Sequence, residues 1–193
     1  MTRVCLVGDG DVNLQYELLS RETAREALAT YDIHEPFENS VGVETVSLGA
    51  AVSLLNDLDW YLVRFVEEAM VLEPSVSEDE WLSRDLARAV RDDELAPEET
   101  GRFIKLYGLE LVDSGPDGAA SSADGDDTER SGDANDADAP EQDGASGGQP
   151  TAPPRRLVEP MYVTRTGGDL PTYDLRDVEE TLVERVTETE FGA

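Results

Sequence analysis

A loop of glycines and carboxylates is the segment of this chain that most resembles a ligand-binding motif. It reads Gly-Asp-Gly-Asp-Val-Asn over residues 8–13 and directly follows the apolar stretch Thr2–Val7. Paired carboxylates after a strand could bind Mg²⁺ or Ca²⁺, and a glycine-rich loop at that place could hold a dinucleotide. Asp9 and Asp11 are therefore candidate metal ligands.

Each of these motifs is incomplete. A dinucleotide loop requires a glycine where Asn13 stands, and a calcium loop requires a glycine where Leu14 stands. A magnesium site of the aspartyl-phosphate hydrolase kind also needs a lysine, and we expect the only lysine, Lys105, on a helix surface. We therefore interpret the segment first as a turn whose Asp and Asn side chains bond to their own backbone.

The chain has one cysteine, Cys5, and one histidine, His34. These numbers exclude an intramolecular disulfide and a zinc site of four Cys and His ligands. The two residues could form a nucleophile–base pair, but a cysteine inside an apolar strand is usually a small core residue. We expect Cys5 in the core and His34 in a solvated loop, and we assign neither catalytic residues nor a cofactor.

Three arginines, Arg84, Arg88 and Arg91, follow one face of an expected helix. Acidic residues at neighbouring positions predict ion pairs within that helix. The alternatives are contact with an anionic protein partner, or DNA binding by a helix-turn-helix. Because phosphate contacts weaken steeply with salt, we do not expect a nucleic acid partner.

Trp60 is expected on the polar side of a helix, beside Arg64. A large exposed aromatic side chain is a candidate anchor for a protein partner. The alternative is that the C-terminal segment or the following linker covers it. The candidate partner-binding residues are thus Trp60, Arg64, Arg84, Arg88 and Arg91.

The composition predicts an environment of very high salt. The chain has 44 acidic and 15 basic residues, a net charge of −29. Only 11 of the acidic residues lie in the tail-like segment 113–156, so the excess is spread over the whole chain. At molar salt the Debye length falls to about 3 Å, which screens the self-repulsion of such a surface. We expect a halophilic, cytoplasmic protein with no membrane segment and no secretion signal.

The central element is expected to be one long helix over Ser47–Leu72, since its apolar residues keep helical spacing throughout. The alternative breaks this helix near Asp57–Asp59 and makes Trp60–Val66 a strand. Thr2–Val7 and Val43–Val46 are expected strands, and a first helix follows residue 14 up to Tyr31.

Two further helices are expected to form a hairpin on the central helix. Ser77 and Glu80 have the spacing of a capping box, and Pro97 and Gly108 suit the two ends of the second helix. We place Ile104 and its neighbours on the buried side of that second helix.

The composition divides the chain into three parts. Residues 1–112 form the main domain, and 113–156 form a disordered acidic linker rich in Gly, Pro, Ser and Asp. Residues 157–193 form a segment that is expected to fold back onto the main domain and pair with the first strand. Leu157–Arg165 is an expected strand, and Glu180–Glu188 fits a helix or a strand. The predicted fold is α+β: a small sheet of N- and C-terminal strands, packed on the long central helix and the helical hairpin.

Two stretches, Asp11–Arg25 and Gly42–Val66, resemble an uncharacterised family of small haloarchaeal proteins, a domain of unknown function. The resemblance implies a saline environment and transfers no activity. The leading hypothesis is a non-catalytic interaction or adaptor protein that binds another protein. The alternatives are a small Mg²⁺- or nucleotide-dependent enzyme built on Asp9-Gly10-Asp11, and a helix-turn-helix-like DNA-binding regulator.

Overall fold

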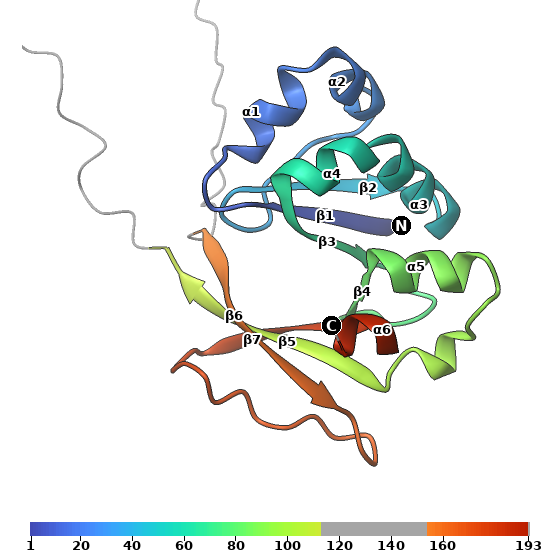
Figure 1. Cartoon of the computed structure of the whole chain (residues 1–193), viewed down its shortest axis with the longest axis vertical. Coiled ribbons are helices and arrows are strands. Elements are labelled where there is room, and N and C mark those ends of the chain that lie inside the picture. Colours follow the sequence, from blue (N-terminus) through green and yellow to red (C-terminus); the bar gives the residue numbers. More distant parts are fainter. Residues whose placement is uncertain (113–153, 193) are drawn as a thin grey trace, which may run out of the picture. The chain divides into compact units, whose positions relative to one another are not determined.

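The computed structural model describes residues 1–112 and 154–192. These residues form a mixed α+β fold with one seven-stranded sheet and six α-helices (Figure 1). The strands are β1 (Thr2–Gly8), β2 (Ser40–Thr45), β3 (Val66–Leu72), β4 (Trp81–Ser83), β5 (Phe103–Leu111), β6 (Arg155–Thr164) and β7 (Glu180–Val186). The helices are α1 (Leu14–Leu19), α2 (Glu22–Leu28), α3 (Leu48–Asp57), α4 (Asp59–Phe65), α5 (Arg84–Arg91) and α6 (Glu188–Phe191), and η1 (Pro97–Glu99) is a 3₁₀-helix.

The sheet has the strand order β2-β1-β3-β4-β7-β5-β6. All neighbours pair antiparallel except β4 and β7, which pair parallel. The sheet is thus larger than the predicted one. It contains strands from both ends of the chain, but the prediction that the C-terminal segment pairs with the first strand is wrong, because β3 and β4 lie between β1 and β7.

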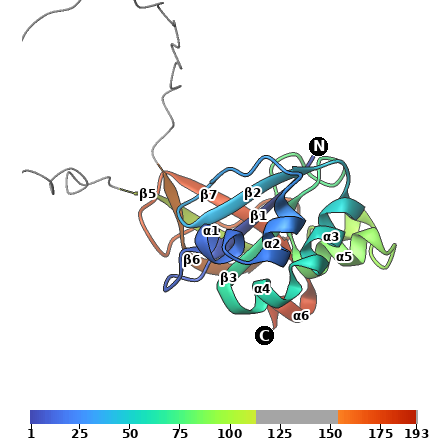
Figure 2. The same ribbon diagram turned by 90° about the horizontal axis from the view of Figure 1, so that it is seen from above.

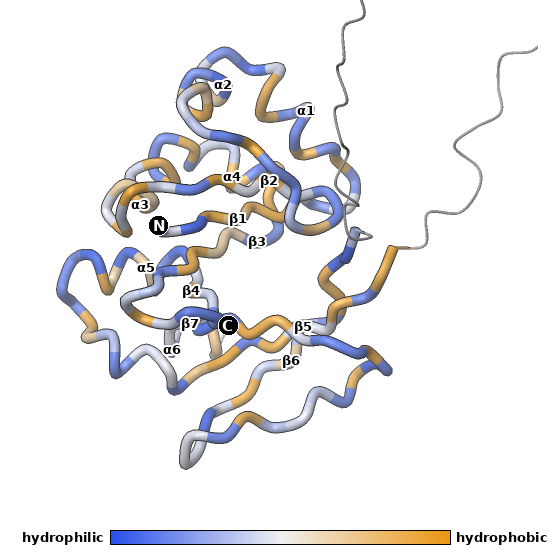
Figure 3. The backbone as a smooth tube through the Cα atoms, turned by 180° about the vertical axis from the view of Figure 1, so that it is seen from behind, coloured by the Kyte–Doolittle hydropathy of each residue, from blue (hydrophilic) through white to orange (hydrophobic). Residues whose placement is uncertain are grey.

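The main hydrophobic core lies between the helices and one face of the N-terminal strands. Figures 1 and 2 show α1, α2, α3 and α4 gathered on the same face of β1, β2 and β3. Val4 and Leu6 of β1 point into this core, where they meet Leu55 of α3 and Leu86 of α5. Figure 3, which colours the backbone by hydropathy, shows hydrophilic and hydrophobic residues interspersed in α5, whereas β5 is largely hydrophobic.

A second, smaller core lies on the other face of the sheet. Cys5 of β1 and Met70 of β3 meet Tyr107 of β5 and Leu182 of β7 there. Strands from both halves of the sheet contribute to this cluster, so the sheet curves around it. The backbone N–H of Glu38, just before β2, donates to the carbonyl of Arg155 in β6 at 2.7 Å, which links the two edges of the curved sheet. We call the face that carries the second core the inner face.

The predicted long central helix is not formed as one rod. Helix α3 ends at Asp57, and α4 begins at Asp59. Leu58 between them has a φ of −91° and a ψ of 0°, which lie outside the helical region. The chain then enters β3 at Val66, so the alternative correctly placed a break near Asp57–Asp59 but put the strand too early. Strand β3 is an interior strand with a core on each face, so its residues Ala69, Met70, Val71 and Leu72 are apolar on both sides of the sheet. A continuous apolar run of this kind fits a helix and an interior strand equally well.

The predicted helical hairpin is also wrong. Glu80 does donate its backbone N–H to the Ser77 side chain at 3.1 Å, but this turn leads into β4, and the helix begins only after Ser83. The second predicted helix shrinks to η1 and is followed by β5. In β5 the side chains of Ile104 and Leu106 lie on one face of the sheet, and those of Lys105 and Tyr107 lie on the other. This alternation is typical of a strand.

The C-terminal part settles the remaining alternative in favour of a strand. Residues Glu180–Val186 form β7, and Leu157–Arg165 lies almost entirely within β6, as predicted. The expected first helix is divided into α1 and α2. Residues 113–153 of the predicted linker lie outside the described residues. Among the described residues, no helix is long and apolar enough to cross a membrane.

Candidate functional site

An exposed aromatic surface lies on α4, and we call its residues Trp60, Val63, Arg64 and the adjoining Arg21 the Trp60 surface. Trp60 is 48% exposed and Val63 is 76% exposed. The two residues lie three positions apart in the same helix, so their side chains project from neighbouring positions on it. In the described part of the chain, about half of the Trp60 side chain, the candidate anchor, is therefore exposed.

The Trp60 ring is held in place from several sides. The guanidinium carbon of Arg64 lies 4.0 Å from the ring centroid, and that of Arg21 lies 5.6 Å from it. Tyr61 and Phe65 meet the same ring edge-to-face, at centroid distances of 5.0 and 6.1 Å. Cation–π contacts at exposed sites contribute about 0.5–1 kcal/mol each. These contacts orient the ring before any partner arrives.

The arginines around this surface differ in whether they form ion pairs. Arg21 forms an ion pair with Glu17 at 2.9 Å, and Arg84 forms one with Asp59, the first residue of α4, at 2.6 Å. Within residues 1–112 and 154–192, Arg64 has no ion-pair partner. Among the described residues, Arg64 is thus the arginine of this surface whose charge is not paired with a carboxylate.

The three arginines that were predicted to form a row on α5 pair with acidic residues in different places. Arg84 reaches across to α4, whereas Arg88 pairs with Asp85 at 3.8 Å and Arg91 with Asp92 at 2.7 Å. Arg88 and Arg91 are therefore compensated within or beside their own helix. Only Arg84, through its bond to Asp59, joins the neighbourhood of Trp60 and Arg64.

The loop that carries Asp9 and Asp11 is a structured turn. Asp9 Oδ1 accepts the backbone N–H of Asp11 at 3.1 Å, and Asn13 accepts the N–H of Tyr16 at 2.9 Å to cap α1. The side chain of Asn39 donates to the carbonyls of Asp9 and Val12, at 3.1 and 2.9 Å. These bonds fix the loop by protein contacts alone.

Metal binding by Asp9 and Asp11 stays a prediction. In the part of the chain that the structure describes, no group of three or more His, Cys, Asp or Glu side chains is arranged to hold a metal ion. Stabilisation by Mg²⁺ that the Asp9→Asn variant abolishes would support the prediction.

Cys5 and His34 both lie next to Gly42. Cys5 pairs with Gly42 in the β1–β2 ladder, and His34 forms an isolated bridge to the same residue. The Cys5 side chain belongs to the second core, and burial, reinforced by the nearby Glu184, raises its pKa to about 12. An activated cysteine nucleophile needs a lowered pKa. The environment of Cys5 is therefore that of a core residue.

A buried polar cluster on the inner face was not predicted from the sequence. Its members are Glu68 of β3, Lys105 and Tyr107 of β5, and Glu184 of β7. Lys105 Nζ and the Tyr107 hydroxyl both donate to Glu68 Oε2. Glu184 is fully buried, and neither of its carboxyl oxygens has a hydrogen-bond partner among the described residues.

The pKa values of this cluster follow from its burial. Burial raises the pKa of Glu184 well above its ordinary value, the Glu68 charge raises it further, and Lys105 opposes both. Burial disfavours the charged form of Lys105, but the carboxylates of Glu68 and Glu184 outweigh this effect and raise its pKa. The cluster thus joins the Glu68–Lys105 ion pair to the buried Glu184, whose pKa is raised. A single lysine in so acidic a chain was the sequence signal that could have pointed to it.

The comparisons with known proteins agree with a family assignment and give no activity. No curated protein and no solved structure shows significant similarity to this chain. The family of unknown function DUF5804 matches residues 2–109, more than half of the 193 residues. This match includes β1 to β4, all helices except α6, and most of β5. The chain belongs to DUF5804, a family of unknown function.

Proposed function

We propose that this chain is a non-catalytic, cytoplasmic interaction protein of an extreme halophile that binds another protein through the Trp60 surface. The observation that carries the proposal is the exposed Trp60 ring stacked under Arg64, a guanidinium without an ion-pair partner in the described part of the chain. Trp and Arg are the residue types most enriched among those that dominate binding energy at protein interfaces.

The arrangement favours a partner segment that presents a carboxylate next to an apolar side chain. A guanidinium stacked on an aromatic ring keeps its N–H groups directed outward in its own plane, where a carboxylate can accept two hydrogen bonds. Trp60 and Val63 supply apolar area beside it. One short segment of a partner could therefore contact all three side chains.

High salt suits this mode of binding. The net charge of −29 would repel an acidic partner in dilute buffer, but molar salt shortens the range of that repulsion to about 3 Å. Excluded salts also strengthen apolar burial. The ion pairs of Arg88 and Arg91 give no support to DNA binding by α5, because those charges are already compensated.

The test is a pull-down with the full chain as bait in molar KCl, followed by mass spectrometry. We expect a defined partner that is retained by wild type and lost with Trp60→Ala, because removing such an anchor costs about 2 kcal/mol or more of binding free energy. Arg64→Ala should weaken the same complex. The matched control is Leu175→Ala, since Leu175 is also 48% exposed but lies outside α4. A partner captured equally by wild type and Trp60→Ala would refute the proposal.

A further inference from the structure

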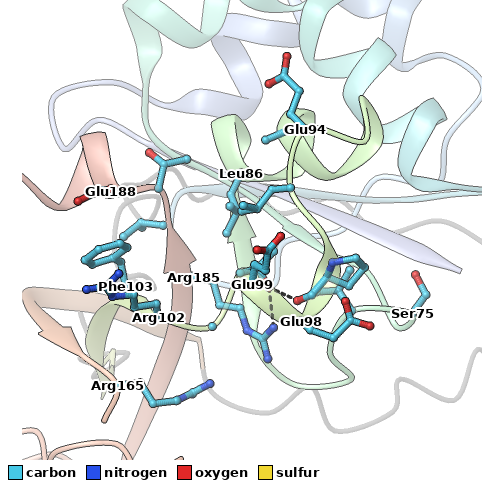
Figure 4. Close-up of a pocket in the computed structure, with 18 of the residues that line it drawn as sticks. Ser75, Leu86, Glu94, Glu98, Glu99, Arg102, Phe103, Arg165, Arg185 and Glu188 are labelled. Atoms are coloured by element: carbon cyan, nitrogen blue, oxygen red, sulfur yellow. Dashed lines mark hydrogen bonds between the residues drawn. The ribbon is translucent and has the colours of Figure 1, made fainter.

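A large pocket lies away from the Trp60 surface, where the region before β5 meets β6 and β7. Its volume is about 1060 Å³, which is at the upper end of typical ligand pockets. Its lining comes from α5, η1 and the segment around Thr100, together with residues near the ends of β6 and β7. Figure 4 shows Arg165 and Arg185 together at one end of this pocket, with Glu98 and Glu99 near them.

Two guanidinium groups share one carboxylate at this end of the pocket. Arg165 Nη2 lies 2.5 Å from Glu80 Oε1, and Arg185 Nε lies 2.6 Å from Glu80 Oε2. Burial raises the pKa of Glu80, but hydrogen bonds from Arg165 and Arg185 outweigh this effect and lower it, so Glu80 is ionised. The three side chains are all less than one-fifth exposed and together have a net charge of +1.

The donors of the two arginines are not all used. Arg185 Nη1 donates to Thr100 Oγ1 at 2.8 Å, and Thr100 in turn donates to the carbonyl of Pro97, which fixes this guanidinium. Arg165 Nε is buried and has no hydrogen-bond partner in the described residues. Because this nitrogen is not accessible from the pocket, and both Nη groups of Arg165 donate to Glu80, a ligand would interact with the charge of the guanidinium pair rather than with this unused donor.

The space beside Arg165 depends on a glycine. A Cβ atom at Gly101 would lie 3.3 Å from Arg165 Nη1, so a side chain there would press against the guanidinium. Gly101 itself lines the pocket. Its missing side chain keeps the approach to Arg165 open.

The apolar and acidic residues that line the rest of the pocket determine which kind of anion it favours. Leu86, Leu95, Phe103 and Val186 supply apolar walls, which suit a ligand with a hydrocarbon body. The exposed glutamates of the lining, Glu94, Glu98 and Glu99 among them, disfavour a ligand with several negative charges. A single charge near Arg165 is favoured, because the guanidinium pair is more buried than these glutamates.

We propose that this pocket binds a small organic carboxylate with one negative charge and an apolar body, its carboxylate at Arg165 and Arg185. The site is separate from the Trp60 surface and does not depend on the proposed function. It uses charge-assisted hydrogen bonds at one end and apolar contact along the walls.

The test is calorimetric titration of the full chain in molar KCl with three probes: phenylacetate, phenylacetamide and inorganic phosphate. We expect phenylacetate to bind at least 10-fold more tightly than phenylacetamide, which has the same shape without the charge, and than phosphate, which has no apolar body. Equal binding of phenylacetate and phenylacetamide, or no binding of phenylacetate, would overturn the proposal.

Two variants and a control locate the binding. Arg165→Gln should weaken phenylacetate binding at least 10-fold, and unchanged binding by the folded variant would contradict the proposal. Because this change also breaks a bond to Glu80, the exposed Glu98→Gln provides a second test. Removing its charge should tighten phenylacetate binding several-fold, and unchanged or weaker binding would count against the site. Arg91→Gln lies outside the pocket and should leave the affinity as in wild type.

Discussion

Glu184 of β7 lies directly opposite Lys105 of β5 in the antiparallel pairing of these strands. The only lysine of the chain thus shares the inner face with a fully buried carboxyl group, while its own hydrogen bond goes to Glu68 on β3. Titratable groups from three strands therefore meet inside an otherwise apolar cluster. The polar groups that bear on Glu184 are Glu68, Lys105, Glu190 and the Cys5 thiol.

The first prediction concerns the pH dependence that Glu184 contributes to stability. In the unfolded chain a glutamate ionises near pH 4.3, whereas burial keeps Glu184 protonated to a higher pH in the folded protein. Between these two pKa values the folded state binds more protons, so the free energy of unfolding falls as the pH rises. Each unit by which the pKa is raised corresponds to about 1.4 kcal/mol.

Glu184→Gln removes this ionisation while keeping the shape of the side chain. We expect the variant to match wild type near pH 4 and to become increasingly more stable than wild type toward pH 7. Chemical denaturation at fixed molar KCl, repeated from pH 4 to pH 8, measures the difference. A difference that stays constant with pH would show that Glu184 does not titrate as described.

The second prediction concerns the Glu68–Lys105 ion pair. Lys105→Met leaves the Glu68 carboxylate without its cation in a largely buried place, and such a loss costs about 3 kcal/mol of folding stability. The double variant Lys105→Met with Glu68→Gln should recover much of that loss, because no unpaired charge remains. Denaturation curves of the two single variants and the double variant measure the coupling. Strictly additive effects would mean that the two side chains do not depend on each other.

The third prediction concerns the turn after β1. A Cβ atom at Gly8 would lie 2.6 Å from Asn39 Nδ2 and 2.8 Å from Leu14 Cβ, so Gly8→Ala should destabilise the fold by about 1–3 kcal/mol. Gly10→Ala is the matched control in the same loop, since nothing lies within 4 Å of a Cβ at that position. We expect that control to change stability by less than about 0.5 kcal/mol. Thermal melting of both variants decides the matter, and equal losses would be inconsistent with the close contact at Asn39.

Local sequence patterns correctly predicted the elements that depend on neighbouring residues alone. Thr2–Val7 is β-branched and apolar and forms β1, and Ser47 caps α3 through a 3.2 Å bond to the N–H of Ala50. Gly167 and Gly168, just after β6, both adopt positive φ, a conformation that glycine takes at little cost. In each case the signal lies within a few neighbouring residues.

The elements that were predicted wrongly depend on pairing with strands that are distant in the sequence. Val66–Leu72 becomes a strand because β1 pairs with it, and Phe103–Leu111 becomes a strand because β6 and β7 pair with its two edges. Helical spacing of apolar residues cannot reveal such pairings. The same pairings create the buried polar cluster, so the error about β5 also hid the role of Lys105.

The Trp60 surface and the pocket arginines likewise differ in whether the sequence could predict them. Trp60 and Arg64 lie four positions apart on one helix, and their neighbourhood could be predicted from helical geometry alone. The joining of Arg165 and Arg185 to Glu80 could not, because these residues lie in separate segments up to 105 positions apart in the sequence. Only the curved sheet brings them together.

The central claim, that Trp60 contacts the partner, is tested most directly by its own fluorescence. The chain has two tryptophans, so Trp81→Phe leaves Trp60 as the only reporter. We predict that adding the purified partner in molar KCl shifts the emission of Trp60 to shorter wavelength and protects it from iodide quenching, because the ring becomes buried. An emission spectrum and quenching constant that stay unchanged while the complex forms would contradict the claim.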